Sequence, residues 1–204
     1  MGFLEKFFKK KAKPASSEGQ VAGLDAAFAA FQNRKKYDFT SFDVIDQISD
    51  EDLIQAIFDY VSEVVIEKDW KNQYRKVKSL PIGFQHIFGL WLLEAEVNNG
   101  GFNQFFYNSS GEFVDEAMNG CIAIGPTRTA KIVSRAVETI MAEKEMQLEV
   151  RKKGTIEAFS ESYKETKLGE CDNEFFKYED DLQNLQIQYI RNIKKDFRLT
   201  KFST

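Results

Sequence analysis

Residues 81–101, PIGFQHIFGLWLLEAEVNNGG, are the stretch that decides the fold of this chain. Pro81 suits the first turn of a helix, because its missing N–H would have no intrahelical partner there. The residues after it are apolar on nearly every side of the helical wheel, and a helix of that kind is covered by other elements all round. The Asn-Asn-Gly-Gly at 98–101 ends the helix, with Gly100 in the left-handed C-terminal cap. The pattern therefore predicts a buried helix in the middle of the protein.

Further helices are predicted on both sides of this central one. Ser49 followed by three acidic residues is typical of an N-cap and a first turn. An apolar stripe at helical spacing follows it. The stripe consists of Ile54, Ile57, Phe58, Val61, Val64 and Val65. Downstream, helices are predicted over 102–107, 112–124, 127–153 and about 173–197. No strand pattern and no internal repeat accompanies them, so the expected fold class is all-α, a single globular multi-helix domain.

Composition agrees with one packed helical domain. The chain has 204 residues, of which 43% are hydrophobic and 29% charged, with 19 Phe and only 3 Pro. Many large apolar side chains and few helix breakers favour packed helices over a turn-rich β fold. The net charge of −4 argues against direct binding of nucleic acid, which calls for a basic surplus. Cys121 and Cys171 lack a CxxC pairing, as expected of buried thiols in the reducing cytoplasm.

The first twenty residues form a separate segment. Apolar positions 3, 4, 7 and 8 share one face of a short basic amphipathic helix, and 13–20 have the composition of a flexible linker. This segment either docks on the main body or another subunit, or touches an anionic membrane surface. It is too short for stable membrane attachment, and no stretch of the chain is apolar enough to span a bilayer. The expected organisation is therefore residues 1–20 as helix and linker, and residues 21–204 as the domain.

No catalytic, cofactor or metal site is predicted. His86 is the only histidine and lies on the most apolar helix, as expected of a core histidine. Three Cys and His residues far apart in sequence do not make a structural zinc site. Phosphate-binding glycine loops are absent from the sequence, so no nucleotide cofactor is expected. These observations favour a non-enzymatic protein without cofactors.

Polar residues around the double glycine leave two interpretations open. Glu94 and Glu96 point to opposite sides of a helix, whereas Glu94 and Asn98 share a face. In the first interpretation, Glu94 caps free backbone N–H groups of the turn that follows. In the second, a polar pocket gives a small-molecule-binding or hydrolytic protein. That pocket would comprise Glu94, Asn98, Asn99, Gln104 and Asn108.

Residues 94–125 resemble the core motif of a bacterial family whose named member is a DNA-mimic protein, otherwise a domain of unknown function. The matching positions are Glu94, Asn99, Gly100, Gly101, Phe102, Gln104, Phe105, Phe106, Asn108, Ala117, Ile124 and Gly125. The resemblance implies an all-helical body and a homodimer. It also implies binding to a transcription factor, with carboxylates standing in place of DNA phosphates.

Two acidic segments are candidates for such a partner-binding surface, because a mimic needs rows of carboxylates with few bases between them. The first comprises Asp43, Asp46, Asp50, Glu51, Asp52, Asp59, Glu63, Glu67 and Asp69. The second comprises Glu157, Glu161, Glu165, Glu170, Asp172, Glu174, Glu179, Asp180 and Asp181. The leading hypothesis is a cytoplasmic protein that binds a DNA-binding protein through these faces. An acidic helix face is also a common form of ordinary solvated surface.

Overall fold

The computed structural model describes residues 33–41, 43–125 and 128–199, and these ranges fold as an all-α domain without strands. The N-terminal segment predicted over 1–20 lies outside them, as does the expected start of the domain at residue 21. The α-helices are α3 (Val44–Gln47), α4 (Asp50–Asp59), α5 (Gln73–Lys78), α6 (Ile82–Tyr107), α7 (Val114–Ala123), α8 (Arg128–Ala142), α9 (Lys144–Lys153), α10 (Ile156–Glu165), α11 (Leu168–Phe175) and α12 (Leu182–Asn192). Shorter turns of helix are the π-helix η1 (Tyr60–Ile66) and the 3-10 helices η2 (Trp70–Asn72), η3 (Ser109–Phe113) and η4 (Lys194–Phe197).

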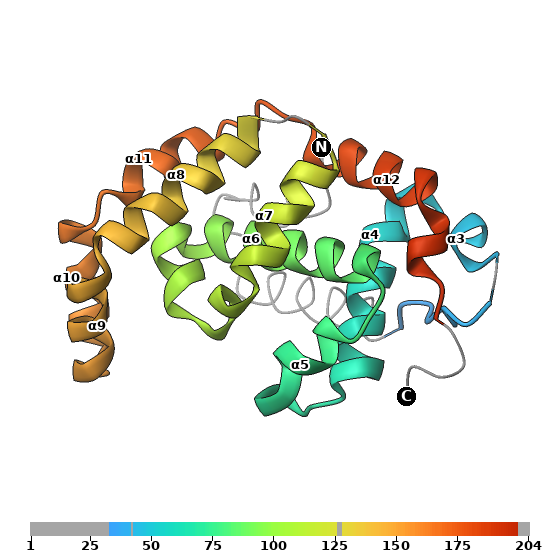
Figure 1. Ribbon diagram of the computed structural model, residues 1–204, viewed down its shortest axis with the longest axis horizontal. Helices are drawn as coiled ribbons and strands as arrows, with labels where there is room; N and C mark the ends of the chain where they lie inside the picture. The colour runs from blue at the N-terminus through green and yellow to red at the C-terminus, as the bar shows by residue number, and fades with distance from the viewer. Residues whose placement is uncertain (1–32, 42, 126–127, 200–204) are drawn as a thin grey trace, which may run out of the picture.

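Helix α6 is the centre of the fold, as the sequence predicts. It contacts α4, α7 and α11, and Figure 1 shows it running through the middle of the molecule beneath α7. Phe84, Ile87, Leu90 and Leu93 on this helix are fully buried. Each such side chain contributes about 1.5–3 kcal/mol when it is removed from water. The hydrophobic core is therefore organised around one helix.

The double glycine interrupts α6 without ending it. Gly100 has φ −153° and Gly101 has φ 73° and ψ 179°, and helical geometry resumes to Tyr107. A positive φ combined with an extended ψ is a conformation that essentially only glycine adopts. The prediction that Gly100 takes a left-handed cap is therefore wrong, because the positive φ falls on the second glycine. The short helix predicted over 102–107 is present as the second half of α6.

The amphipathic helix after Ser49 changes character at its C-terminal end. It is α-helical to Asp59 and then continues as the π-helix η1. A π-helix has more residues per turn than an α-helix, so the apolar stripe loses its register there. Val61 is buried as predicted, but Ile66, which lies outside the predicted stripe, is buried as well, and Val64 is 53% exposed. The prediction that Val64 continues the apolar stripe is therefore wrong.

Two long predicted helices are each divided. The segment predicted over 127–153 bends at Glu143 into α8 and α9. The segment predicted over about 173–197 is broken at residues 176–181, where Tyr178 has a φ of 46°, and resumes as α12. Helices α9 and α10 pack together at one end of the molecule (Figure 1). None of the helices in the described ranges combines the length and apolarity that a bilayer span needs.

Candidate functional site

The break in α6 is closed by a carboxylate from α11. Asp172 Oδ1 accepts a hydrogen bond from the backbone N–H of Phe102 at 2.7 Å. On the other side of the break, the Tyr163 hydroxyl donates to the carbonyl oxygen of Gly100 at 2.8 Å. Burial raises the pKa of the Asp172 carboxyl, and the Phe102 N–H opposes that shift by stabilising the anion. The capping carboxylate is thus Asp172, which corrects the interpretation that assigned this role to Glu94.

Glu94 instead joins α6 to the loop before α12 and to α12 itself. Its Oε1 accepts a hydrogen bond from Gln186 Nε2 at 2.8 Å, and its Oε2 accepts one from the Tyr178 hydroxyl at 3.3 Å. Asn98 Nδ2 donates to both the Tyr178 hydroxyl oxygen and the Glu94 carbonyl oxygen. Burial raises the pKa of the Glu94 carboxyl to about 7, although both side-chain donors lower it. The predicted shared face of Glu94 and Asn98 is therefore present.

Glu96 faces a different group of side chains, as its spacing from Glu94 predicts. Its Oε2 accepts hydrogen bonds from Gln104 Nε2 at 2.6 Å and from Asn108 Nδ2 at 2.9 Å. Its Oε1 accepts one from the Ser110 hydroxyl at 2.6 Å. This carboxylate therefore fastens the first half of α6 to its second half and to η3.

The residues expected to form one polar pocket lie in these two separate groups. Glu94 and Asn98 belong to the first, Gln104 and Asn108 belong to the second, and Asn99 is exposed. In both groups the polar atoms are hydrogen-bonded to one another, as in a structural network. Sequence reasoning missed the partners Tyr178, Gln186 and Ser110, because nothing in the local pattern connects them to the motif.

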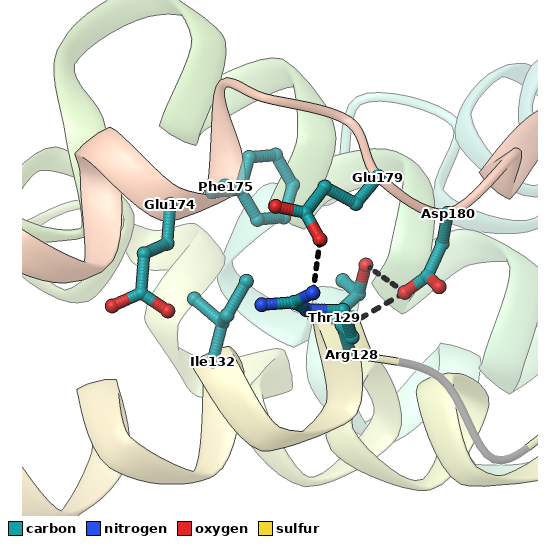
Figure 2. Close-up of a pocket in the computed structure, with 7 residues that line it drawn as sticks. All are labelled: Arg128, Thr129, Ile132, Glu174, Phe175, Glu179 and Asp180. Carbon is teal, nitrogen blue, oxygen red and sulfur yellow. Dashed lines mark hydrogen bonds and ion pairs between the residues drawn. The ribbon is translucent and has the colours of Figure 1, made fainter.

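A small pocket lies elsewhere, between the start of α8 and the end of α11. Figure 2 shows Thr129 turned toward Asp180, whose Oδ2 accepts hydrogen bonds from the Thr129 backbone N–H at 2.7 Å and its hydroxyl at 2.8 Å. Arg128 forms an ion pair with Glu179 across the opening. The remaining space holds little more than a water molecule. This arrangement caps α8 and leaves no room for an organic ligand.

The first acidic segment, residues 43–69, is largely paired with cations. Asp59 accepts two hydrogen bonds from Arg34, at 2.7 and 2.8 Å, and Asp50 pairs with Arg191 at 2.5 Å. The further ion pairs are Asp46 with Lys194, Glu63 with Lys36, and Asp69 with Lys76. Asp43 and Asp52 accept hydrogen bonds from neighbouring polar side chains, and Glu51 and Glu67 are exposed. Residues distant in the sequence thus neutralise much of this segment.

The second acidic segment, residues 157–181, divides into helix caps and exposed surface. Asp172, Asp180 and Asp181 cap the second half of α6, α8 and α12 respectively, the last through the N–H of Asn184 at 3.1 Å. Glu174 pairs with Arg135 at 2.7 Å, and Glu179 with Arg128. The exposed remainder is Glu157, Glu161 and Glu165 on α10, with Glu170 on α11.

Asp172 and Glu94, both partly buried, thus tie α11 and α12 to the broken central helix of an all-helical protein. A family model described as DMP19-like protein matches residues 78–193, more than half of the chain. The chain therefore belongs to the DMP19-like protein family. No curated protein and no solved structure matched the chain. The matched range contains the whole of α6 and the residues that close its break.

Proposed function

We propose that this protein is a non-enzymatic protein-binding domain whose acidic surface takes the place of DNA on a DNA-binding protein. Membership of the DMP19-like protein family supports this proposal, because the core motif resembles that of a DNA-mimic family. The double glycine and the Glu94 and Glu96 networks build the scaffold. The partner surface is the acidic face of α10, formed by Glu157, Glu161 and Glu165.

The row of carboxylates on α10 is the observation that carries the proposal. Glu157, Glu161 and Glu165 are exposed and four residues apart, so they lie along one side of the helix. At a rise of 1.5 Å per residue, successive carboxylates are about 6 Å apart along the axis. One DNA strand carries a charge about every 3.4 Å of axis. The row of carboxylates can therefore pair with about every second cation on a protein surface that binds one DNA strand.

The carboxylates of this row are available to a partner, because the protein's own cations hold them only weakly. Lys164 pairs with Glu161 at 2.8 Å, but the two side chains are 72% and 63% exposed. Such a solvated pair contributes little to stability and is readily replaced by a partner's cation. In residues 43–69, by contrast, Arg34 holds Asp59 in a partly buried ion pair, and Arg191 pairs with Asp50 while also donating to the carbonyl oxygen of Ile48. The α10 face is for this reason a better partner surface than the first acidic segment.

Charge reversal on α10 tests the proposal. The triple variant Glu157→Lys, Glu161→Lys, Glu165→Lys should fold normally, because all three side chains are exposed. Immobilised wild-type protein should retain a DNA-binding protein from a bacterial lysate, and both duplex DNA and high salt should release it. The triple variant should retain no DNA-binding protein from the same lysate.

A matched control reverses the same number of charges elsewhere. Glu67 after η1, Glu112 on η3 and Glu138 on α8 are exposed residues in three separate places. Changing these three to Lys alters the net charge equally but leaves α10 intact. If the control variant lost the partner as fully as the α10 variant, or if duplex DNA failed to displace the partner, the proposal would be wrong.

A further inference from the structure

The turn η2 and helix α5 present aromatic and basic side chains together on one exposed side. Trp70 is 56% exposed and Tyr74 38% exposed, and the basic residues Lys71 and Arg75 follow them in sequence and are exposed as well. The opposite side of the same segment is buried through Gln73 and Val77. The exposed side therefore alternates rings and cations along the helix. We call Trp70, Lys71, Tyr74 and Arg75 the cationic aromatic face.

Contacts with the rest of the domain hold this face in place. Val77 is fully buried, and Lys76 Nζ donates to the carbonyl oxygen of Ile66 at 3.0 Å. Lys78 forms an ion pair of 2.7 Å with the buried Glu116 on α7. The Tyr74 ring packs against Phe113 at an interplanar angle of 54°, with ring centroids 5.5 Å apart. The face is therefore a preorganised part of the surface.

The charge of this face is locally positive. Lys76 pairs with Asp69 and Lys78 with Glu116, which leaves Lys68, Lys71 and Arg75 without an ion pair in the described ranges. Asp115 on α7 acts on Lys78, and the exposed Glu67 directly precedes Lys68 in the chain. The Debye length is about 8 Å at physiological salt, so a ligand at this face experiences these cations more than the distant acids of the chain. The net charge of −4 therefore does not describe this surface.

We propose that the cationic aromatic face binds single-stranded nucleic acid. Two bases stack on Trp70 and Tyr74, and the phosphates between and beside them pair with Lys71, Arg75 and Lys68. Every base offers a flat face and every nucleotide a phosphate, so this recognition does not depend on sequence. It is a second surface, separate from the α10 face of the proposed function.

The shape of the face favours this ligand over a protein segment or a membrane. Peptides are recognised by an exposed strand edge, by a groove, or by clusters of arginine. This face is the convex side of a helix, carries one arginine, and has no strand beside it in the described part of the chain. Interfacial membrane helices insert a broad apolar face, whereas the exposed large apolar side chains of this segment are Trp70 and Tyr74. Trp70 beside Lys71 and Tyr74 beside Arg75 each supply a flat ring for a base and a cation for a phosphate.

The emission of Trp70 gives a direct measurement. The chain contains two tryptophans, and Trp91 stacks on Phe58 with ring centroids 3.5 Å apart. In a Trp91→Phe variant, confirmed as folded by circular dichroism, all tryptophan emission comes from Trp70. An oligo(dT) of about twenty nucleotides should quench that emission saturably, because a base stacks on the indole. With three cations engaged, the logarithm of the binding constant should fall with the logarithm of salt concentration with a slope of about −2.

Two pairs of variants test base stacking and local charge separately. One pair compares the loss of Trp70 with the loss of another exposed apolar side chain, and the other compares charge reversal at the face with the same charge reversal elsewhere. Trp70→Ala should weaken oligo(dT) binding at least about five-fold in an anisotropy assay, whereas Ile156→Ala, at an 80% exposed apolar residue, should not. Lys71→Glu with Arg75→Glu should abolish binding. Lys144→Glu with Lys153→Glu changes the net charge equally on α9 and should leave affinity within about two-fold at 0.15 M salt.

Several results would overturn the proposal. One is the absence of saturable oligo(dT) binding at low salt. Another is equal loss of affinity in the α9 charge variant and in the Lys71→Glu, Arg75→Glu variant. A third is binding of poly-glutamate or of vesicles containing anionic lipid that is tighter than oligo(dT) binding and depends on Trp70, since either would assign the face to an acidic protein or a membrane.

Discussion

The carboxylate of Asp172 lies 2.7 Å from the backbone nitrogen of Phe102, and this hydrogen bond joins α11 to the break in the central helix. The N–H groups at the start of a helical segment lack intrahelical partners. Here the second half of α6 begins inside the protein, where water cannot supply the missing acceptor. A side chain seventy residues away in sequence supplies it instead.

Removing this cap should destabilise the fold. Asp172→Ala leaves the Phe102 N–H without an acceptor, and a hydrogen bond to a charged group contributes about 1.5–3 kcal/mol. We expect the free energy of unfolding, measured with urea, to fall by about 2 kcal/mol. Asp172→Asn retains an acceptor oxygen and should lose less. Equal stability of the Ala variant and the wild type would contradict the capping role.

A side chain at Gly101 should be tolerated poorly. A Cβ there would lie 2.4 Å from Asp172 Oδ2, and φ is already 73°. The strain and the overlap should together lower the free energy of unfolding by about 3 kcal/mol or more in Gly101→Val. Gly169→Ala is the control, because a Cβ at that position meets nothing within 4 Å. Unchanged melting temperatures in both variants would show that the break does not require glycine.

The stability of the protein should depend on the protonation of Glu94. Its pKa is about 7 in the folded state, above the ordinary 4.5, so the folded state binds the proton more tightly than the unfolded chain. Its contribution to stability is therefore full below pH 4.5 and is lost as pH rises to about 7, with a total of roughly 3 kcal/mol at most. Glu94→Gln imitates the protonated form and should remove this loss.

Urea unfolding at pH 5 and at pH 8 measures the difference between the two proteins. Glu94→Gln should gain stability relative to the wild type at the higher pH. With the Gln186 amide turned over, its Oε1, which is buried without a hydrogen bond in the described structure, would accept from the new amide. Parallel pH profiles for the two proteins would show that Glu94 is ionised throughout.

Glu96 should stabilise the fold through the three side chains that donate hydrogen bonds to it. Glu96→Ala leaves Gln104, Asn108 and Ser110 without their common acceptor. Since part of this group is reached by water, we expect a loss of about 1–3 kcal/mol in the free energy of unfolding. Hydrogen exchange should rise in η3 and in the second half of α6 more than in α12. A uniform rise across the domain would argue against a local role.

The sequence predicts the parts of the fold that depend on local pattern. The burial of α6 follows from its apolar composition, and the opposite directions of Glu94 and Glu96 follow from helical periodicity. Val64 does not follow the predicted apolar stripe because η1 is a π-helix. Nothing in the residue composition of this segment predicts that change of helix type. Helix class within an amphipathic segment is set by packing, and the periodicity of the sequence does not determine it.

The roles of the acidic residues depend on contacts between distant segments. Asp172, Asp180 and Asp181 lie in an acidic stretch that resembles a solvated face, yet each caps a helix segment. The cations that neutralise Asp46 and Asp50 are Lys194 and Arg191, which come 148 and 141 residues later in the chain. A single sequence contains no information on such pairing. The cationic aromatic face was not predicted either, although its residues form the pairs Trp-Lys at 70–71 and Tyr-Arg at 74–75, because the exposure of these side chains depends on how α5 packs.

The measurement that tests the central claim most directly is the salt dependence of partner binding to the α10 face. The partner retained from lysate would be purified, and its affinity measured for the wild type and for the Glu157→Lys, Glu161→Lys, Glu165→Lys variant over a range of salt concentrations. We predict a steep loss of affinity with salt for the wild type, competition by duplex DNA, and at least about a hundred-fold weaker binding to the variant. Equal affinity of the two proteins at every salt concentration would contradict the proposed role of α10.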